Sequence, residues 1–259
     1  MSPSANTEEY RSGDPSLAFV DDKAEKAPTF DDPYEERKYL KHRLALGFRV
    51  LANFGLAEGV AGYVTVRNSV DPNSFWVYPF GLYFSLIRDE DLIRVDHEGK
   101  VVNRGKNRRL NYGAYAIYAE IYKARPDDFC VFWNDHILWP NFAGLVLAQA
   151  EGKAIAATLG TKKAVLLGNH GIMTVGPTIE ATIAWFVLLE RCCQIQLLVD
   201  ASSAGSGKPV LTIGELEAKS TWEAVGTTGN GYFQGLPLFQ VAEQEFNKRS
   251  FLGKELKAA

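Results

Sequence analysis

The four histidines of this 259-residue sequence are the side chains best suited to metal or acid–base chemistry, and they lie far apart. They are His42, His97, His136 and His170, and the sequence contains no HxH, HxxxH or CxxC pair. A catalytic zinc site needs three protein ligands, commonly with two of them on one strand or one helix turn. The spacing of the histidines therefore does not predict a complete zinc site.

His170 has the surroundings that most favour a role in a site. It lies in Gly168-Asn-His-Gly171 between two apolar runs, which predict two strands joined by a tight turn. Glycines in such a turn let the backbone approach a ligand closely. His42 is on the charged side of a predicted helix and His97 is in a polar turn, so both are predicted to face solvent. His136 could cap a turn or titrate near neutrality, and loop histidines are more often structural than catalytic.

Composition and charge exclude several classes of protein. A content of 46% hydrophobic and 23% charged residues is typical of a globular domain. The net charge of −3 and the absence of a long basic cluster argue against a nucleic-acid partner. Neither a signal peptide nor an uninterrupted apolar run of spanning length is found, so we expect a cytoplasmic protein with no membrane partner. The three cysteines are predicted to be buried free thiols.

The elements that must position these residues form one predicted domain with a tail at each end. Residues 1–32 are rich in Ser, Pro, Asp, Glu and Lys, so they are predicted to form a disordered N-terminal arm. The domain is predicted to occupy residues 33–259. Its first helix begins at Pro33 with Asp32 as its cap, carries an apolar stripe, and ends at Gly55.

Short strands and longer helices follow that first helix. Three β-type runs separated by turn residues predict an antiparallel meander, and two later runs flank the turn at His170. A long helix that is apolar almost all round is expected to lie in the core or in a subunit interface. The predicted strands are 62–67, 75–78, 92–95, 164–168 and 171–175, and the predicted helices are 111–124, 147–159 and 178–199. Residues 201–208 are predicted to be a flexible linker, and they lack the residues of a phosphate-binding loop. After the linker, a short helix and a C-terminal tail helix are predicted on either side of the glycine-rich stretch 226–235.

Six segments of the chain carry a family resemblance. They read FGLAEGVAGYVTVR (54–67), FWVYPFGLYFSLI (75–87), DLIRVDHEGKVV (91–102), IYKARPD (121–127), AVLLGNHGIMTVG (164–176) and WFVLLERCCQIQLL (185–198). Together they resemble the class II aldolase/adducin family, especially its fungal-type branch, from about residue 35 to 240. The resemblance implies an α/β fold, namely an α/β/α sandwich around a mainly antiparallel sheet, and a homotetramer with sites at subunit interfaces. It also implies a divalent metal, typically zinc, that an HxH pair and a later histidine hold to stabilise an enediolate during aldol cleavage.

The chain departs from the family pattern at the metal site. His170 matches the later histidine, but the HxH pair has no counterpart. In relatives that pair follows the RPD turn, whereas here residues 125–127 run directly into 128–136, which resemble a segment well downstream. One core strand-helix segment is therefore predicted to be missing, and His170 is predicted to be a residual ligand only. Because one imidazole cannot hold a catalytic metal, no cofactor is expected.

Aromatic residues replace polar ones around the expected site. Compared with close relatives, Tyr63, Tyr83 and Tyr118 stand where polar or histidine residues are expected, and Ala114 stands where the aldolases place a catalytic glutamate. With Phe80 and Tyr112 these rings could line a pocket for an apolar or aromatic ligand, or they could fill the space of the lost strand. The candidate catalytic residues are His170, Tyr118 and Tyr63, and the candidate substrate-binding residues are Gly168, Asn169, Phe80, Gly81, Tyr83 and Tyr112.

Three functional hypotheses follow from these observations. The first is a repurposed small-molecule enzyme of specialised metabolism, with lyase or cyclase chemistry through tyrosine hydroxyls and His170 and without a metal. The second is a non-catalytic, adducin-like scaffold or partner subunit that keeps the fold for oligomerisation. The third is a mis-spliced form of a metal-dependent aldolase, because the missing piece is contiguous and both flanks still match the family.

Overall fold

The computed structural model describes most of the predicted domain. It covers residues 26–102, 109–111, 115–117, 119–121, 132, 134–141, 149–226 and 228–258, with the backbone alone for 228, 229 and 248–258. Most of the predicted N-terminal arm therefore lies outside the described residues. Of the helix predicted over 111–124, residues 111, 115–117 and 119–121 are described, and all of them except Asn111 are helical.

Helix α1 (Pro33–Asn53) begins and ends where the sequence predicts. The Asp32 side chain accepts a hydrogen bond of 2.8 Å from the backbone N–H of Tyr34, and Pro33 occupies the first helical position. Gly55 has a positive φ of 73°, which suits the residue that follows a helix. The apolar stripe is buried, and Leu44 and Phe48 are both 0% exposed. These caps fix the length of the helix that crosses the core.

The described strands form two three-stranded sheets. The first is an antiparallel meander of β1 (Val66–Arg67), β2 (Ser74–Val77) and β3 (Ile93–Asp96), as predicted, although β1 is shorter than the run 62–67. The short 3₁₀ helices η3 (Phe84–Leu86) and η4 (Asp89–Asp91) connect β2 to β3. In the second sheet β5 (Ala164–Leu167) pairs antiparallel with β6 (Gly171–Thr174) and parallel with β4 (His136–Trp139). Strand β4 was not predicted.

The later helices differ from the predictions at their ends. Helices α3 (Gln149–Leu159) and α5 (Glu215–Val225) match predicted helices, whereas α4 (Ile179–Ser206) extends through most of the predicted linker 201–208 and is capped by Gly207 at a φ of 66°. Helix α6 (Thr228–Ala258) includes the glycine-rich stretch that was predicted to separate two helices. The prediction of buried thiols is wrong for Cys192, which is exposed, and for Cys193, which is partly exposed, while Cys130 lies outside the described residues.

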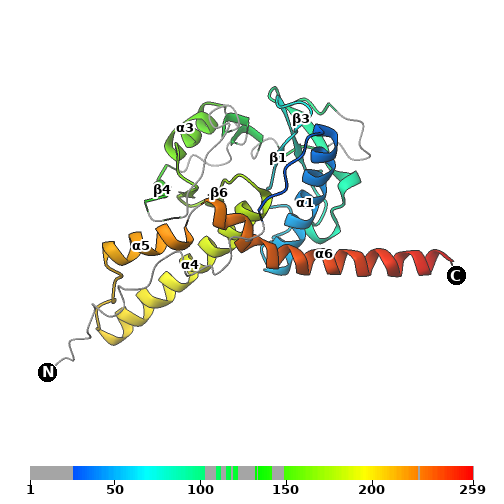
Figure 1. Ribbon diagram of the computed structural model, residues 1–259. Coiled ribbons are helices and arrows are strands. Elements are labelled where there is room, and N and C mark those ends of the chain that lie inside the picture. The colour runs from blue at the N-terminus through cyan, green and yellow to red at the C-terminus, as the bar shows by residue number, and fades with distance from the viewer. Residues whose placement is uncertain are drawn as a thin grey trace.

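The largest core lies where α1, α4 and α6 cross (Figure 1). Helix α4 buries its first half, from Ile179 to Leu189, against α1, α6 and β6. A second cluster packs α3 against β5 and β6, with Ile155 and Leu159 at its centre. By length and composition, α4 is the one helix among the described residues that could cross a membrane, but its buried first half behaves as a core helix. The predicted α/β class is confirmed, with helices packed against both small sheets.

Candidate functional site

The turn at His170 is built as the sequence predicts. Residues Gly168 to His170 connect β5 to β6, and the backbone N–H of His170 donates a 2.9 Å hydrogen bond to the carbonyl of Leu167. Asn169 has a φ of 55°, a left-handed conformation that asparagine tolerates. A Cβ at Gly168 would lie 3.1 Å from the carbonyl oxygen of Pro140, so glycine suits this close approach. Both Asn169 and His170 are exposed, and the imidazole is accessible to a ligand.

The described aromatic candidates lie around the first sheet. Tyr63 is half-buried in the core, where its ring packs against Tyr78 at 5.4 Å between centroids. Phe80 and Gly81 lie in the turn after β2, where the N–H of Phe80 donates to the carbonyl of Arg109 at 2.9 Å and Gly81 has a φ of 95°. Tyr83 is 46% exposed. Tyr63 therefore contributes to packing, and Tyr83 is on the surface.

The hydroxyl of Tyr78 shows how polar atoms are satisfied in this aromatic cluster. It donates to the backbone carbonyl of Val60 at 3.2 Å and lies 3.4 Å from that of Gly62. Burial raises the pKa of Tyr78 to about 12, so this hydroxyl stays a neutral donor at physiological pH. Its protonated state suits a structural role better than that of a catalytic base.

The candidate residues thus come from two different sheets, with His170 on the second sheet and Tyr63, Phe80, Gly81 and Tyr83 around the first. Two further candidates, Tyr112 and Tyr118, lie outside the described residues, as does Ala114. Within the part of the chain that is described, no group of three or more His, Cys, Asp or Glu side chains could hold a metal ion. The described candidate residues do not form the three-ligand set that a zinc site of this family requires.

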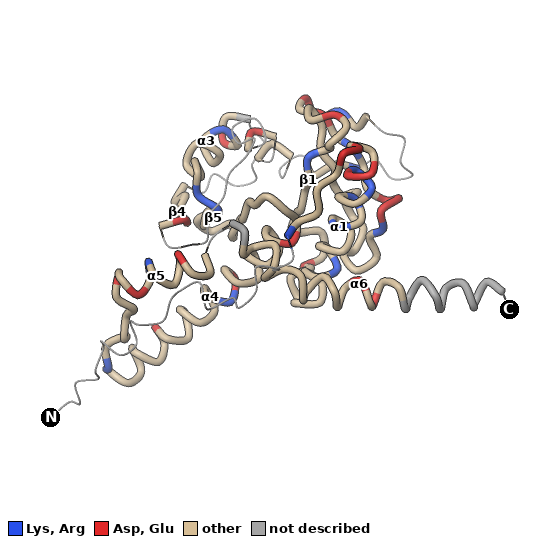
Figure 2. Tube along the Cα trace, viewed as in Figure 1, with Lys and Arg blue, Asp and Glu red and all other residues tan. Residues whose placement is uncertain are grey.

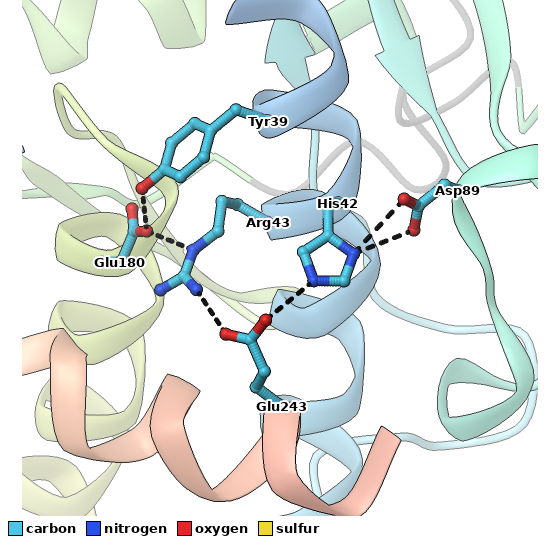
Figure 3. Close-up of polar contacts among 6 residues, drawn as sticks. All are labelled: Tyr39, His42, Arg43, Asp89, Glu180 and Glu243. Carbon is cyan, nitrogen blue, oxygen red and sulfur yellow. Dashed lines mark hydrogen bonds and ion pairs between the residues drawn. The ribbon is translucent and has the colours of Figure 1, made fainter. Parts of the chain in front are cut away.

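A network of charged and polar side chains, which the sequence did not predict, joins α1 to three other elements (Figure 3). Three members lie on one face of α1, and the others come from η4, α4 and α6. The members are Tyr39, His42, Arg43, Asp89, Glu180 and Glu243. The spacing 39, 42 and 43 on one helix is the signal that could have indicated a shared face.

Glu180 and Glu243 are the two carboxylates that bind Arg43 in this network. Glu180 is 1% exposed and accepts hydrogen bonds from Arg43 Nε at 2.5 Å and from the Tyr39 hydroxyl at 3.1 Å. Glu243 lies 3.3 Å from Arg43 Nη1 and 3.2 Å from His42 Nε2. Burial and the neighbouring Glu180 raise the pKa of Tyr39 well above its ordinary value. Each side chain of the network has a hydrogen-bond or ion-pair partner within it, so the network connects α1 to α4 and α6.

The prediction that His42 and His97 face solvent is wrong. His42 is partly buried between Asp89, at 3.3 Å from Nδ1, and Glu243, and the hydrogen bond to Asp89 is the main reason that its pKa is raised. His97 is also partly buried, with its ring centroid 6.1 Å from that of Phe75. His136 opens β4 as an exposed residue, and its Nδ1 lies 2.9 Å from the carbonyl of Phe132, in agreement with a structural role.

Comparison with known proteins identifies the family. Residues 42–136 and 128–197 match the family model described as the class II aldolase and adducin N-terminal domain. The chain belongs to the class II aldolase/adducin family. It is 36% identical to the solved L-fuculose 1-phosphate aldolase from Glaciozyma antarctica PI12, with a TM-score of 0.76 over 86% of this chain and 96% of that one. The predicted family and fold class are thereby confirmed.

Two bacterial enzymes are among the similar curated relatives. Decarboxylase NovR of Streptomyces niveus is 37% identical over 86% of this chain and 90% of its own length. The enzyme named 4-hydroxy-3-prenylphenylpyruvate oxygenase/4-hydroxy-3-prenylbenzoate synthase, of Streptomyces roseochromogenus subsp. oscitans, is 38% identical over 73% of this chain and 78% of its own. More distant relatives include alpha-adducin of Rattus norvegicus, at 28% identity over 81% of this chain and 32% of the adducin.

The alignments contain a gap in this chain. The alignment with the decarboxylase spans 250 positions but covers 86% of the 259 residues, which is about 223, so about 27 positions have no residue of this chain opposite them. The alignment with the synthase likewise spans 218 positions over 73% of the chain. The family model also matches in two pieces, residues 42–136 and 128–197, which overlap at residues 128–136. These findings agree with the prediction of a missing segment after Asp127.

Proposed function

We propose that this family member is a small-molecule enzyme of specialised metabolism that acts on a carbonyl-containing, apolar or aromatic substrate without the metal of its relatives. Its reaction would be of the carbon–carbon lyase or cyclase type and would proceed by proton transfer. The observation that carries the proposal is the similarity, at 37% and 38% identity, to a decarboxylase and to an enzyme named for a prenylated phenylpyruvate. A phenylpyruvate combines an aromatic ring with a 2-oxo acid, which is the substrate class expected from the aromatic candidates.

The described residues support specific roles in such a reaction. The imidazole of His170, exposed on its turn, is the candidate for moving a proton next to the substrate carbonyl, and a positioned acid or base supplies roughly 10²–10⁴-fold. Gly168 and Asn169 would hold the turn against the ligand. Phe80, Gly81 and Tyr83, together with Tyr112, would contact the substrate. Tyr118 and Tyr63 are the candidate hydroxyl groups, and the packing of Tyr63 in the core favours Tyr118 of the two.

The test is turnover of substituted phenylpyruvates by the purified full chain, followed by chromatography, with and without a chelator. We expect turnover that EDTA does not change, and a loss of about 10²-fold or more in the His170→Ala variant. His136→Ala, which removes another exposed histidine from the same sheet, should leave turnover unchanged. Stoichiometric, tightly bound zinc in the purified protein, or loss of activity in EDTA, would contradict the metal-free site.

A second candidate function is an adducin-like scaffold or partner subunit, which the similarity to alpha-adducin favours. It predicts that no phenylpyruvate raises the melting temperature and that His170→Ala has no functional effect. The third possibility, a mis-spliced metal aldolase, is tested by the genomic sequence between the codons for Asp127 and Asp128. An open reading frame there that encodes an HxH pair would establish it.

A further inference from the structure

The second sheet has an open edge at β4. In the strand order β4-β5-β6, β4 pairs with β5 alone among the described strands, so its other side faces no described strand. We propose that this outer edge of β4 is a binding site for an extended peptide segment of another protein, which adds to the sheet as a further strand. Binding here depends on main-chain groups of β4 and is independent of the proposed function.

The hydrogen bonds to β5 show which residues of β4 face the open edge. The backbone carbonyls of Asp135 and Trp139 accept hydrogen bonds of 3.3 Å and 2.8 Å from N–H groups of β5 and of the turn after it. In a strand, the backbone groups of successive residues point alternately to the two neighbouring strands. Every second residue from Asp135 to Trp139 therefore bonds to β5. The residues between them, His136 and Leu138, direct their N–H and C=O groups to the open edge.

These outward groups are available for a new strand. Within the part of the chain that the structure describes, neither the backbone N–H nor the C=O of His136 or Leu138 forms a hydrogen bond at this edge. Both residues are exposed, Leu138 by 58%, so solvent reaches the edge. A row of unpaired N–H and C=O groups is a template for pairing with another extended chain. The edge therefore determines the form of its ligand, which must be an extended backbone.

Strand β4 lacks the features that usually protect an edge. Edge strands in natural proteins commonly carry charged side chains, proline or a bulge, which prevent pairing with other chains. Figure 2 shows β4 in tan, without Lys, Arg, Asp or Glu between His136 and Trp139. Its four residues pair one to one with Ala164–Leu167, without a bulge, and Pro140 follows only after the strand has ended. An exposed edge of this kind suits recognition by strand addition.

The side chains of β4 determine the composition of the segment that fits. Ile137 and Trp139 pack against the core cluster between α3 and the sheet. Leu138 lies on the opposite face, because side chains alternate along a strand. A strand added beside β4 would therefore have apolar cross-strand neighbours on both faces. We expect a segment with β-branched, leucine or aromatic residues at successive positions and without proline.

The gap in the alignments favours a peptide segment over a second copy of this chain as the ligand. About 27 positions of the alignment with decarboxylase NovR have no residue of this chain opposite them. The two pieces of the family match overlap at residues 128–136, and β4 begins at His136. A relative with these extra positions therefore has additional chain directly before this strand. The open edge thus coincides with a segment that this chain lacks and that another protein can supply.

The test is binding of a fluorescent synthetic peptide to the full chain, measured by anisotropy. The peptide has the sequence of decarboxylase NovR opposite the gap, and we expect saturable binding to the wild type. Leu138→Pro removes an outward N–H but no bond to β5, and proline is tolerated on an edge strand whose N–H faces solvent. It should weaken binding by about 10-fold or more, because a main-chain bond is lost and the ring blocks the edge. Leu138→Thr is the matched control, which loses the same side chain but keeps the N–H, and it should lose much less.

Hydrogen exchange locates the bound peptide. The amides of His136 and Leu138 should exchange more slowly when the peptide is present, whereas those of β1, at the edge of the first sheet, should not change. No binding, unchanged exchange in β4, or equal affinities of Leu138→Pro and Leu138→Thr would overturn the proposal. A wild-type dimer that Leu138→Pro converts to a monomer would also overturn it and would assign the edge to a second copy of the chain.

Discussion

The carboxylate of Glu180 connects two helices from a position that is 1% exposed. It accepts hydrogen bonds from Arg43 and Tyr39, and Arg43 also reaches Glu243 on α6. The guanidinium of Arg43 lies 4.4 Å from the centroid of the Phe239 ring, which adds a cation–π contact. A buried charge is tolerated because it is paired and hydrogen-bonded, so removal of one partner leaves the other at a high cost.

The first prediction follows from this pairing. Glu180→Ala should lower the free energy of unfolding by about 3–5 kcal/mol, because Arg43 is left buried without its main acceptor. The combined variant Arg43→Met with Glu180→Leu should lose less than Glu180→Ala, since no charge is left unpaired. Urea unfolding measures both. Glu35→Ala, which breaks the exposed pair with Lys38, is the control and should change stability by less than about 1 kcal/mol. A double variant less stable than Glu180→Ala would refute this account.

The second prediction concerns the pH dependence of stability. The hydrogen bond to Asp89 raises the pKa of His42 despite partial burial, and Glu243 acts in the same direction. A raised pKa in the folded state means that protonated His42 stabilises the fold at low pH and that this stabilisation is lost as the pH rises through the raised pKa. The stability difference between wild type and His42→Gln should therefore be larger at about pH 6 than at about pH 8. His136→Gln is the control, and a pH-independent difference for His42→Gln would contradict the prediction.

At the scale of the elements, glycines determine how closely α6 approaches α4. A Cβ at Gly235 would lie 2.5 Å from the backbone oxygen of Glu180, and one at Gly231 would lie 2.3 Å from the Trp185 ring. Neither contact is possible unless neighbouring atoms move. Glycine in the interior of a helix costs about 1 kcal/mol relative to alanine, so these positions give up helix propensity for close packing.

The third prediction tests whether glycine at these positions is needed for the close packing of α6 on α4. Gly235→Ala should destabilise the protein by about 1–3 kcal/mol, because the backbone of α4 blocks the added methyl group. Gly205→Ala is the matched control within α4, where nothing lies within 4 Å of the added Cβ, and it should stabilise by roughly 0.4–1 kcal/mol. Thermal and urea unfolding measure the change in the free energy of unfolding for each variant, which should be negative for Gly235→Ala and positive for Gly205→Ala. Stabilisation by both substitutions would mean that α6 does not approach α4 this closely.

These same glycines explain which elements the sequence could predict. Local signals were sufficient for α1, where Asp32, Pro33 and Gly55 mark both ends, and for the meander and the His170 turn. Residues 201–208 were predicted as a linker and the glycine-rich stretch as a break between helices, because glycine disfavours helices. Both are nevertheless largely helical: α4 continues to Ser206, and α6 is held by its packing. Strand β4 is four residues long and pairs in parallel with a strand 28 residues away, so its sequence alone carries little signal.

The candidate site was predictable only where one segment builds it. The turn at His170 depends on adjacent residues, and its glycine and asparagine conformations are as expected. The positions of Tyr63 and His42 depend on segments distant in the sequence. Tyr63 packs in the core beside Tyr78, and His42 meets Glu243, which is 201 residues away. No periodicity within a helix reveals such a partner.

At the scale of the whole molecule, the gap of about 27 aligned positions separates this chain from its relatives. The family model matches residues 42–136 and 128–197, and the similarity to the solved aldolase has a TM-score of 0.76. The fold is therefore retained although these aligned positions have no counterpart in this chain. The His170 turn, the ligand position that the family resemblance implies, is still formed by β5 and β6.

The fourth prediction restores the missing piece. The segment to insert between Asp127 and Asp128 is the corresponding one of the L-fuculose 1-phosphate aldolase from Glaciozyma antarctica PI12. It would supply the HxH pair that the family resemblance implies. Because a zinc site needs three protein ligands, the insertion should create one zinc site per chain, measured by elemental analysis after dialysis. The insertion combined with His170→Ala should bind much less zinc, whereas the insertion combined with His136→Ala should bind as much as the insertion alone. A folded chimera without zinc would show that His170 is not placed as the third ligand.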